Sequence, residues 1–148
     1  MEIKIFKIRE TEQEKLEIHC HNITEQIKEI VTFVKTRQGQ LTGIMENKQY
    51  EIPVVDVHYI EAVDNKVFIY SSKKVYETKQ KLYELEEILK EKYFLRVSKS
   101  LLLNLMKVQS IKAGLNGRFM AVLQSGEEII ISRKYVPDLK KALKGGAF

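Results

Sequence analysis

Residues 94–104 read FLRVSKSLLLN, and residues 129–133 read IIISR. In each stretch, small hydroxyl and cationic side chains stand directly beside an apolar run. The apolar run anchors the chain in a core, so the adjoining polar and positively charged side chains are held at an edge that faces solvent. Such an edge suits contacts to phosphate groups and to the edges of bases. The two stretches therefore indicate a surface that reads DNA.

The positive charge of the chain is concentrated in its second part. Residues 92–148 contain 11 Lys and Arg against 3 Asp and Glu, a net charge of +8, whereas residues 1–91 contain 14 against 17, a net charge of −3. Together these give the formal net charge of +5. Clustered positive charge attracts a polyanion and gains free energy from released counterions. A Lys-rich region can equally be a solvated surface, so charge alone leaves both interpretations open.

Length and composition predict one globular domain, alone or with an N-terminal extension. The 148 residues are 44% hydrophobic and 30% charged, which is enough for one ordinary core. The longest stretches without Asp, Glu, Lys or Arg have 8 residues, at 38–45 and 119–126, against the roughly 20 apolar residues of a membrane-spanning helix. The first residues alternate apolar and charged side chains and contain no signal-peptide core. With a single cysteine in addition, we expect a cytoplasmic protein.

The first third of the chain predicts two short strands, a helix and a hairpin. Period-two alternation marks the strands. Asn22 is the expected N-cap of the helix, whose apolar stripe ends before Gly39. Pro53 is expected to end the second strand of the hairpin. The predicted strands span residues 3–8, 16–18, 41–45 and 49–53.

From residue 54 onward the pattern is mostly β, so the predicted fold class is mainly β (α+β). Runs rich in β-branched and aromatic residues are separated by turn residues. Leucine and isoleucine spacing predicts a helix over residues 79–90, and a short amphipathic helix is expected near Pro137. The pair at 116–117, Asn-Gly, favours a hairpin turn. We expect the end of the chain to fray at Gly145 and Gly146. The predicted strands of this part span 59–63, 67–70, 75–78, 108–113, 119–123 and 128–132.

Several of these features, in this order and spacing, resemble the bacterial LytTR DNA-binding domain over residues 53–143. The resemblance implies small antiparallel sheets with short helices, in which loops rather than a recognition helix enter successive major grooves. It thus implies sequence-specific DNA binding and transcription regulation. It also divides the chain into an N-terminal extension at residues 1–52 and a LytTR-type domain at residues 53–148. The matching features are Tyr59-Ile60-Glu61, the strand at 67–70, the leucines of the helix at 79–90, residues 94–100, Leu103-Asn104, Gly126 and Ser132-Arg133.

The resemblance implies DNA contacts from three places. They are the loop after the Phe-x-Arg motif, the Ser-Arg pair after the last strand, and the turn before the strand at 67–70. Arg133 is expected to make a bidentate contact to guanine, because its planar fork matches the O6 and N7 edge. Relatives often have His or Asn where this chain has Ser98-Lys99, so the base preference of that loop is not transferred. The predicted DNA-binding residues are Asn65, Lys66, Ser98, Lys99, Ser100, Arg133 and Lys134.

The resemblance also bears on partners. Family regulators often carry a phosphoacceptor receiver domain, and the first ~50 residues are too short for one. The chain instead resembles standalone regulators whose genes often lie beside a small membrane protein that restrains them, so a membrane antagonist is expected by analogy. The extension is expected to dimerise, to contact that antagonist or to cap the β domain. We favour a homodimer, because binding repeated half-sites side by side increases affinity.

Two residues of the decisive stretch have a structural interpretation beside a DNA-binding one. Arg96 is expected to be a structural pin paired with Glu61 or with a backbone carbonyl, although it could also bind phosphate. Asn104 is expected to orient the loop through backbone hydrogen bonds rather than to touch DNA.

Other functions find little support in the motifs. Residues 19–21, His-Cys-His, offer at most two ligands on one face of a strand, so no metal site is predicted. There is no Gly-rich phosphate loop, His-Glu-x-x-His motif or nucleophile elbow, so we predict no enzyme, cofactor or small-molecule substrate. The alternative function is a protein-binding regulatory module without direct DNA recognition, which uses residues 82–89 or the N-terminal helix.

Overall fold

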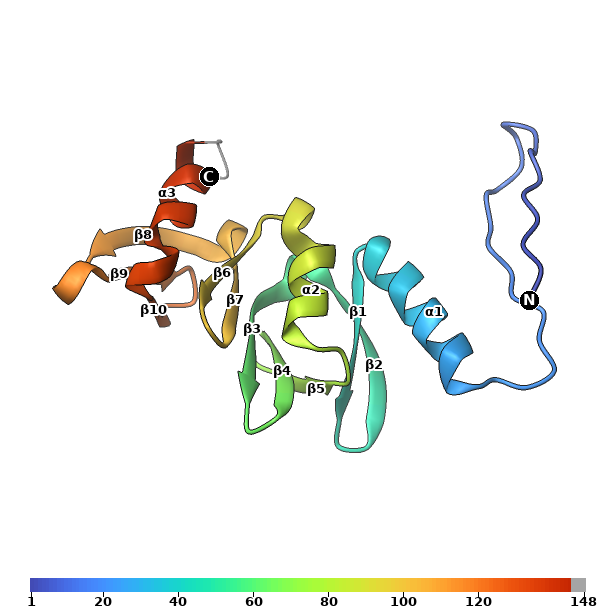
Figure 1. Cartoon of the computed structure of the whole chain (residues 1–148), viewed down its shortest axis with the longest axis horizontal. Coiled ribbons are helices and arrows are strands. Elements are labelled where there is room, and N and C mark those ends of the chain that lie inside the picture. Colours follow the sequence, from blue (N-terminus) through green and yellow to red (C-terminus); the bar gives the residue numbers. More distant parts are fainter. Residues whose placement is uncertain (145–148) are drawn as a thin grey trace.

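A computed structural model describes residues 1–144, which form two antiparallel sheets and three α-helices in an elongated arrangement (Figure 1). The predicted fraying at residues 145–146 lies outside these residues. The helices are α1 (Glu25–Arg37), α2 (Leu82–Leu89) and α3 (Val136–Lys144). The strands are β1 (Gln40–Met45), β2 (Lys48–Pro53), β3 (Val57–Val63), β4 (Lys66–Ser71), β5 (Val75–Thr78), β6 (Phe94–Ser98), β7 (Leu101–Asn104), β8 (Val108–Ala113), β9 (Phe119–Leu123) and β10 (Glu128–Ile131).

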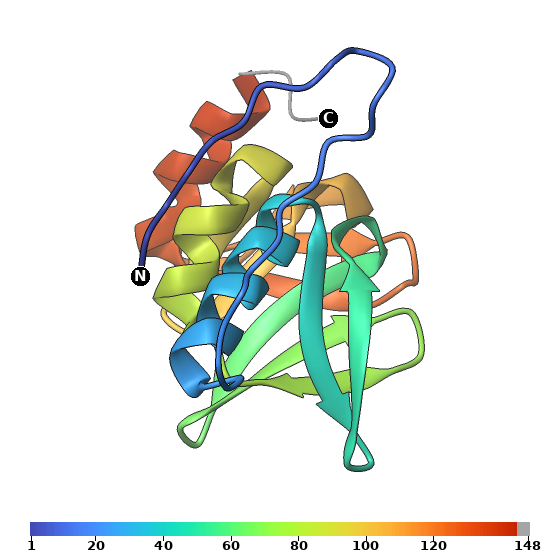
Figure 2. The same cartoon turned by 90° about the vertical axis from the view of Figure 1, so that its right-hand side faces the viewer.

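The larger sheet has seven strands in the order β2-β1-β5-β4-β3-β7-β6, and the smaller has the order β10-β9-β8. All neighbouring strands within both sheets are antiparallel. The three helices lie on the same side of the molecule in Figure 2, and Figure 1 shows them spaced along its length in the order α3, α2 and α1. The predicted mainly β fold, with small antiparallel sheets and short helices, is confirmed.

Strand β7 decides how the two sheets pack, because its side chains are buried on both faces. Leu102 is fully buried with Ile60 and the leucines of α2 in one core. Leu101 and Leu103 point the other way, into a second core shared with the three-stranded sheet and α3. A strand buried on both faces reads as a continuous apolar run instead of an alternating one. The three consecutive leucines are therefore the sequence signature of a strand between two cores.

The second core fixes the smaller sheet against the end of the larger one. Val97 of β6 and Leu103 of β7 are fully buried there, as is Leu139 of α3. The inward residues of the smaller sheet, such as Leu123 and Ile131, are also fully buried. The smaller sheet and α3 are thereby attached to β6 and β7 by apolar packing, which sets where the chain emerges after β10.

Asn104 joins the end of β7 to the start of β3. Its side chain is buried, its Nδ2 donates to the Val57 carbonyl at 2.8 Å, and its Oδ1 accepts the Met106 N–H at 3.0 Å. The second bond caps the 3-10 turn at Leu105–Lys107, which leads to β8. The prediction that Asn104 acts through backbone hydrogen bonds is confirmed.

The hairpin of the first third belongs to the larger sheet. Strand β1 pairs with β5 as well as with β2, at the register Ile44 to Glu77. A Cβ atom on Gly43 would lie 2.6 Å from the Tyr76 Cβ atom, so only glycine allows this close approach. The division between residues 1–52 and 53–148 stays a prediction. Over residues 1–144, no helix is both long enough and apolar enough to cross a membrane.

Two predictions for the first 24 residues are wrong. The expected strands at 3–8 and 16–18 do not form, because no described strand pairs with them and alternation alone supplies no hydrogen-bonding partner. The helix cap is Thr24 instead of Asn22, and its Oγ1 accepts the Ile27 N–H at 3.3 Å. The helix and the hairpin that follow it are confirmed.

We expect Asn104→Ala to destabilise the fold by about 2 kcal/mol, because it leaves the buried Val57 carbonyl without its donor and removes the cap at Met106. Urea unfolding monitored by circular dichroism measures this loss. Asn22→Ala, at an exposed side chain outside the helices and strands, is the control. An unchanged unfolding midpoint for Asn104→Ala would show that the hydrogen bonds of Asn104 do not stabilise the fold.

Candidate nucleic-acid interface

Three loops that are far apart in the sequence meet at one edge of the molecule: the β3–β4 turn, the β6–β7 turn and the segment after β10. The Ser132 N–H donates to the Val97 carbonyl at 2.8 Å, which joins the last two. The Ala62 N–H donates to the Ser100 carbonyl, also at 2.8 Å, which joins the first two. The β3–β4 and β6–β7 turns lie on the same, lower side of the molecule in Figure 1. All seven predicted DNA-binding residues lie in or beside these loops.

The β3–β4 turn holds Asn65 in a left-handed conformation. The φ angles of Asp64 and Asn65 are 51° and 64°, which are typical of a two-residue type I′ hairpin turn. Asn65 and Lys66 are both exposed. The Lys66 Nζ lies 3.8 Å from a carboxylate oxygen of Glu77, so this lysine is loosely paired within the sheet.

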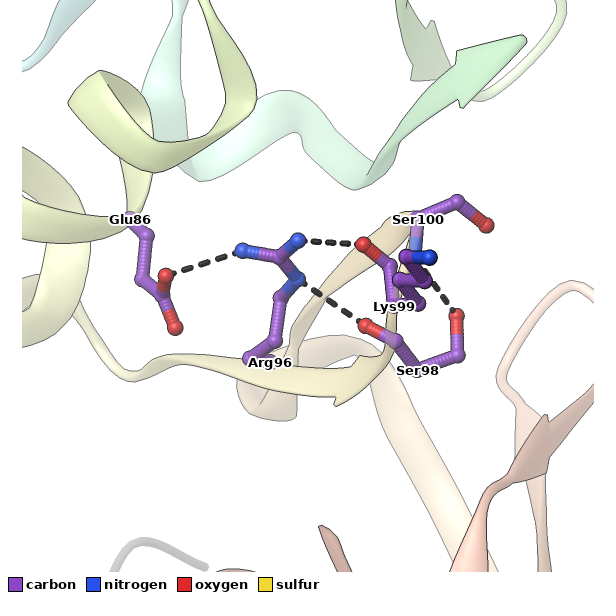
Figure 3. A network of polar contacts seen from close by, with 5 residues as sticks. All are labelled: Glu86, Arg96, Ser98, Lys99 and Ser100. Carbon is purple, nitrogen blue, oxygen red and sulfur yellow. Dashed lines mark hydrogen bonds and ion pairs between the residues drawn. The ribbon is translucent and has the colours of Figure 1, made fainter. Parts of the chain in front are cut away.

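Arg96 shapes the β6–β7 turn (Figure 3). Its Nε donates to the Ser98 carbonyl at 2.9 Å, and a terminal nitrogen donates to the Lys99 carbonyl. The other terminal nitrogen pairs with Glu86 of α2 at 2.9 Å. The Ser100 N–H donates to the Ser98 Oγ at 3.2 Å. The guanidinium therefore occupies the inside of the turn, while the Lys99 side chain is exposed.

The prediction that Arg96 is a structural pin holding a carbonyl is confirmed, but the expected pairing with Glu61 is wrong. Its carboxylate partner is Glu86, because α2 packs beside β6 and brings that residue to the turn. Spacing along the chain shows that Glu86 lies on the outer side of a helix, and it does not show which strand the helix covers.

Arg133 and Lys134 open the 3-10 turn that follows β10, and both side chains are exposed. The stem of Arg133 crosses the β8–β9 turn at Gly117. A Cβ atom there would lie 2.9 Å from the Arg133 Cδ atom, and the φ angle of Gly117 is +77°. The backbone conformation favours glycine at this position, and any larger residue would also push the Arg133 stem aside. The Lys134 Nζ lies 5.6 Å from the centroid of the Tyr135 ring.

The β8–β9 turn adds two polar residues that the sequence interpretation missed. Asn116 and Arg118 border the same hollow, of about 610 Å³, as the residues after β10. The Asn-Gly pair predicts the turn, but only the packing of the smaller sheet brings it to Arg133. The hollow is lined by Asn116, Arg118, Ile130, Ser132, Arg133 and Lys134.

Apart from Lys66, which is loosely paired with Glu77, the outward-facing cations at this edge are free to meet an anion. Within residues 1–144, Lys99, Arg118 and Arg133 form no ion pair shorter than 4.0 Å, in contrast to Arg96 with Glu86. Exposed cations that converge without acidic partners produce a positive potential that favours a polyanion. Over the same residues, no three His, Cys, Asp or Glu side chains come together as a metal site.

Tyr59 connects the larger sheet to the turn before β10. Its hydroxyl donates to the carboxylate of Glu127, and its ring stacks on Tyr70 with centroids 4.4 Å apart. Burial, followed by the hydrogen bond to Glu127, raises the pKa of Tyr59 far above its ordinary value. The raised pKa favours the protonated phenol, which donates to Glu127 in the turn before β10.

Comparison with known proteins yields one family and several relatives. The family described as the LytTr DNA-binding domain matches residues 47–144. A Bacillus cereus protein named sensory transduction protein LytT is 29% identical over 113 residues, which are 76% of this chain and 46% of that protein. The Bacillus anthracis protein of the same name is 29% identical over 93 residues, 63% of this chain and 38% of that protein. The chain thus spans less than half the length of these two relatives.

A third relative matches over nearly its whole length. It is a Staphylococcus aureus (strain MSSA476) protein named an uncharacterized HTH-type transcriptional regulator, 24% identical over 145 residues, 97% of this chain and 98% of that protein. In residues 1–144 of the present chain, however, strands separate each α-helix from the next, so no helix-turn-helix is formed.

A solved structure shares the fold. It is a LytTr DNA-binding domain from a Bacillus cereus protein described as a methyl-accepting/DNA response regulator. The TM-score is 0.68 at 24% identity, and the match covers 71% of this chain and 96% of that one.

We expect Arg96→Lys to loosen the β6–β7 turn, because a lysine ammonium cannot bridge Glu86 and two carbonyls in one plane. The free energy of unfolding should fall by about 1–3 kcal/mol, and the Ser100 and Ala62 amides should exchange hydrogen faster. Glu87→Gln is the control. It lies on α2 like Glu86, removes an exposed ion pair with Lys90, and should change the free energy of unfolding little. Equal exchange in both variants would contradict this role of Arg96.

Proposed function

The chain belongs to the LytTr DNA-binding domain family, and from that premise we propose that this DNA-binding transcriptional regulator recognises specific sequences in double-stranded DNA through loops that enter the major groove. One observation carries the proposal: two backbone hydrogen bonds hold three loops with exposed cations at one edge. Loops joined in this way move as a unit and can contact several positions of one duplex.

We propose Arg133 as the main base-reading residue. Its exposed guanidinium can make two parallel hydrogen bonds to the O6 and N7 atoms of guanine, and its stem is supported by Gly117. A supported stem loses less conformational freedom on binding. Lys134 and Lys99 would bind phosphates on either side, which positions the protein without specifying sequence.

The hydroxyl and amide side chains would add contacts of lower strength. The Ser98 Oγ accepts the Ser100 N–H, so its own proton is available for a DNA acceptor. Ser100, Asn65 and Lys66 complete the proposed DNA-binding residues, the last two from the β3–β4 turn. This family is a DNA-binding module and not a known enzyme family, and we propose no reaction for it.

We propose further that the protein binds repeated half-sites as a homodimer. One domain offers only a short edge of proposed DNA-contacting loops, which we call the reading edge. In a dimer, the binding of the second domain becomes intramolecular, which raises the overall affinity without new contacts. The N-terminal extension, residues 1–52 in the proposed division, is the part of the chain available for this association.

A membrane-protein antagonist is the second proposed partner, and it rests on the resemblance to standalone regulators. Affinity purification of the protein from solubilised intact membranes should recover a small membrane protein encoded by a neighbouring gene. Purification of the same protein from cells that lack that gene is the control. Recovery of the protein from membranes without any such companion would end this proposal.

We expect Arg133→Ala to weaken binding to the target DNA by ~1–3 kcal/mol, because it removes the bidentate contact and leaves the fold intact. Fluorescence anisotropy with the upstream intergenic DNA of the protein's own gene, against scrambled DNA, measures the loss over a salt series. Wild-type binding should fall in log K against log salt with a slope of about −4 or steeper. Arg37→Ala on α1, a distant exposed arginine, is the control.

Arg133→Lys separates charge from geometry in the same assay. It should keep the binding to scrambled DNA and lose the preference for the target, because lysine retains the charge without the planar fork. If neither DNA binds, or if Arg133→Ala binds the target as tightly as the wild type, the reading edge is wrong. That result would favour the alternative function, a protein-binding regulatory module without direct DNA recognition.

A further inference from the structure

Residues 1–23 present apolar side chains to solvent instead of to a core. Ile3, Ile5 and Phe6 are 85%, 93% and 77% exposed. Within residues 1–144, the one backbone hydrogen bond of this segment joins the Glu12 N–H to the Arg9 carbonyl, at its turn. Alternating apolar and charged residues with an unpaired backbone are ready to pair with another chain.

An apolar groove lies between the second half of this segment and α1. The apolar stripe of α1 lines the groove and is only partly covered: Ile27 is buried, whereas Val31 is 36% exposed and Ile23 is 72% exposed. The groove measures about 470 Å³. It is lined by Leu16, Ile18, Cys20, Ile23, Ile27, Val31, Val34, Lys35 and Gln38.

The two halves of the segment carry opposite charge. Residues 1–9 contain three basic side chains and one acidic, and residues 10–18 contain one basic and four acidic. The ion pairs of the described segment join near neighbours, Lys4 with Glu2 and both Lys15 and His19 with Glu17, and none joins the two halves. Each half is thus complementary to the other half of a second copy.

This face lies at the opposite end of the molecule from the three-stranded sheet (Figure 1). In Figure 1 the segment lies beyond α1, at the end of the molecule away from the β3–β4 and β6–β7 turns. A chain that docks here leaves the proposed reading edge open.

We propose that the occupant of this face is a second copy of the chain. Residues 3–8 of each copy lie in the α1 groove of the other, so that residues 1–9 of one copy run beside residues 10–18 of its partner. A two-fold interface requires a surface that complements itself, and the opposite charges of the two halves meet this requirement. This face is the interface of the proposed homodimer. Only the use of that dimer on DNA rests on the proposed function.

Sedimentation equilibrium of the full chain tests the interface. The wild type should have twice the 17.3 kDa of one chain. Ile5→Glu in the segment and Val31→Glu in the groove should each weaken the dimer by roughly 30-fold or more, as expected for a central apolar contact. Met106→Glu, at a side chain 56% exposed outside this face, should leave the dimer unchanged. A wild-type monomer at tens of micromolar would overturn the inference.

Charge exchange distinguishes pairing between copies from pairing within one chain. A Lys4→Glu, Lys7→Glu variant and a Glu12→Lys, Glu14→Lys variant should each self-associate more weakly, because like charges then face each other. Mixed in equal amounts, they should recover the dimer, since each half then meets an opposite charge. Failure to recover on mixing would contradict the exchange. Melting curves verify that all variants remain folded.

DNA binding separates this inference from the proposed function. Ile5→Glu should bind a single half-site as the wild type does and lose the added affinity of two half-sites. A dimer that binds no DNA would overturn the function and leave the interface standing. A monomer that binds target DNA would overturn the interface and leave the proposed DNA binding standing. A monomer that binds a membrane protein through Ile5 and Val31 would assign the face to that partner and overturn the inference.

Discussion

The hydrogen bond from the Ser132 N–H to the Val97 carbonyl is the constraint on which the candidate interface depends. Val97 belongs to β6, at the end of the seven-stranded sheet, and Ser132 follows β10 of the other sheet. One 2.8 Å contact therefore decides how far Arg133 lies from the β6–β7 turn. Because Val97 is fully buried, its carbonyl cannot move without disturbing the core between the sheets. The apolar packing thereby sets the spacing of the polar loops.

At the β6–β7 turn, too, one residue orders the backbone and another faces solvent. Arg96 directs its charge inward, to Glu86 and to two carbonyls, while Lys99 directs its charge outward. The inner cation orders the backbone and the outer one remains available to phosphate. At the other side of the interface, the buried Tyr59 and its bond to Glu127 restrict the turn that leads into β10. These internal contacts hold the loops in fixed positions, as the proposed recognition of DNA by loops requires.

Much of this arrangement could be predicted from local chemistry. Alternation and turn residues located the meander β3–β5, and the resemblance placed a loop at Ser98–Ser100, where β6 turns into β7. Partners set by tertiary packing could not be predicted. Glu86 pairs with Arg96 because α2 packs beside β6, and Arg118 lines the same hollow as Arg133 because the smaller sheet packs beside the segment after β10. The strands expected at 3–8 and 16–18 are absent, because strand character in a sequence is realised only where a partner strand is present.

The central claim is that the three loops form one DNA-reading edge. Amide chemical-shift mapping of the full, isotopically labelled chain during titration with its target duplex tests this most directly. We expect the largest shifts at Asn65, at residues 98–100 and at residues 132–134, with little change along α1. Shifts concentrated on α1 and α2, or absent from any one of the three loops, would contradict it.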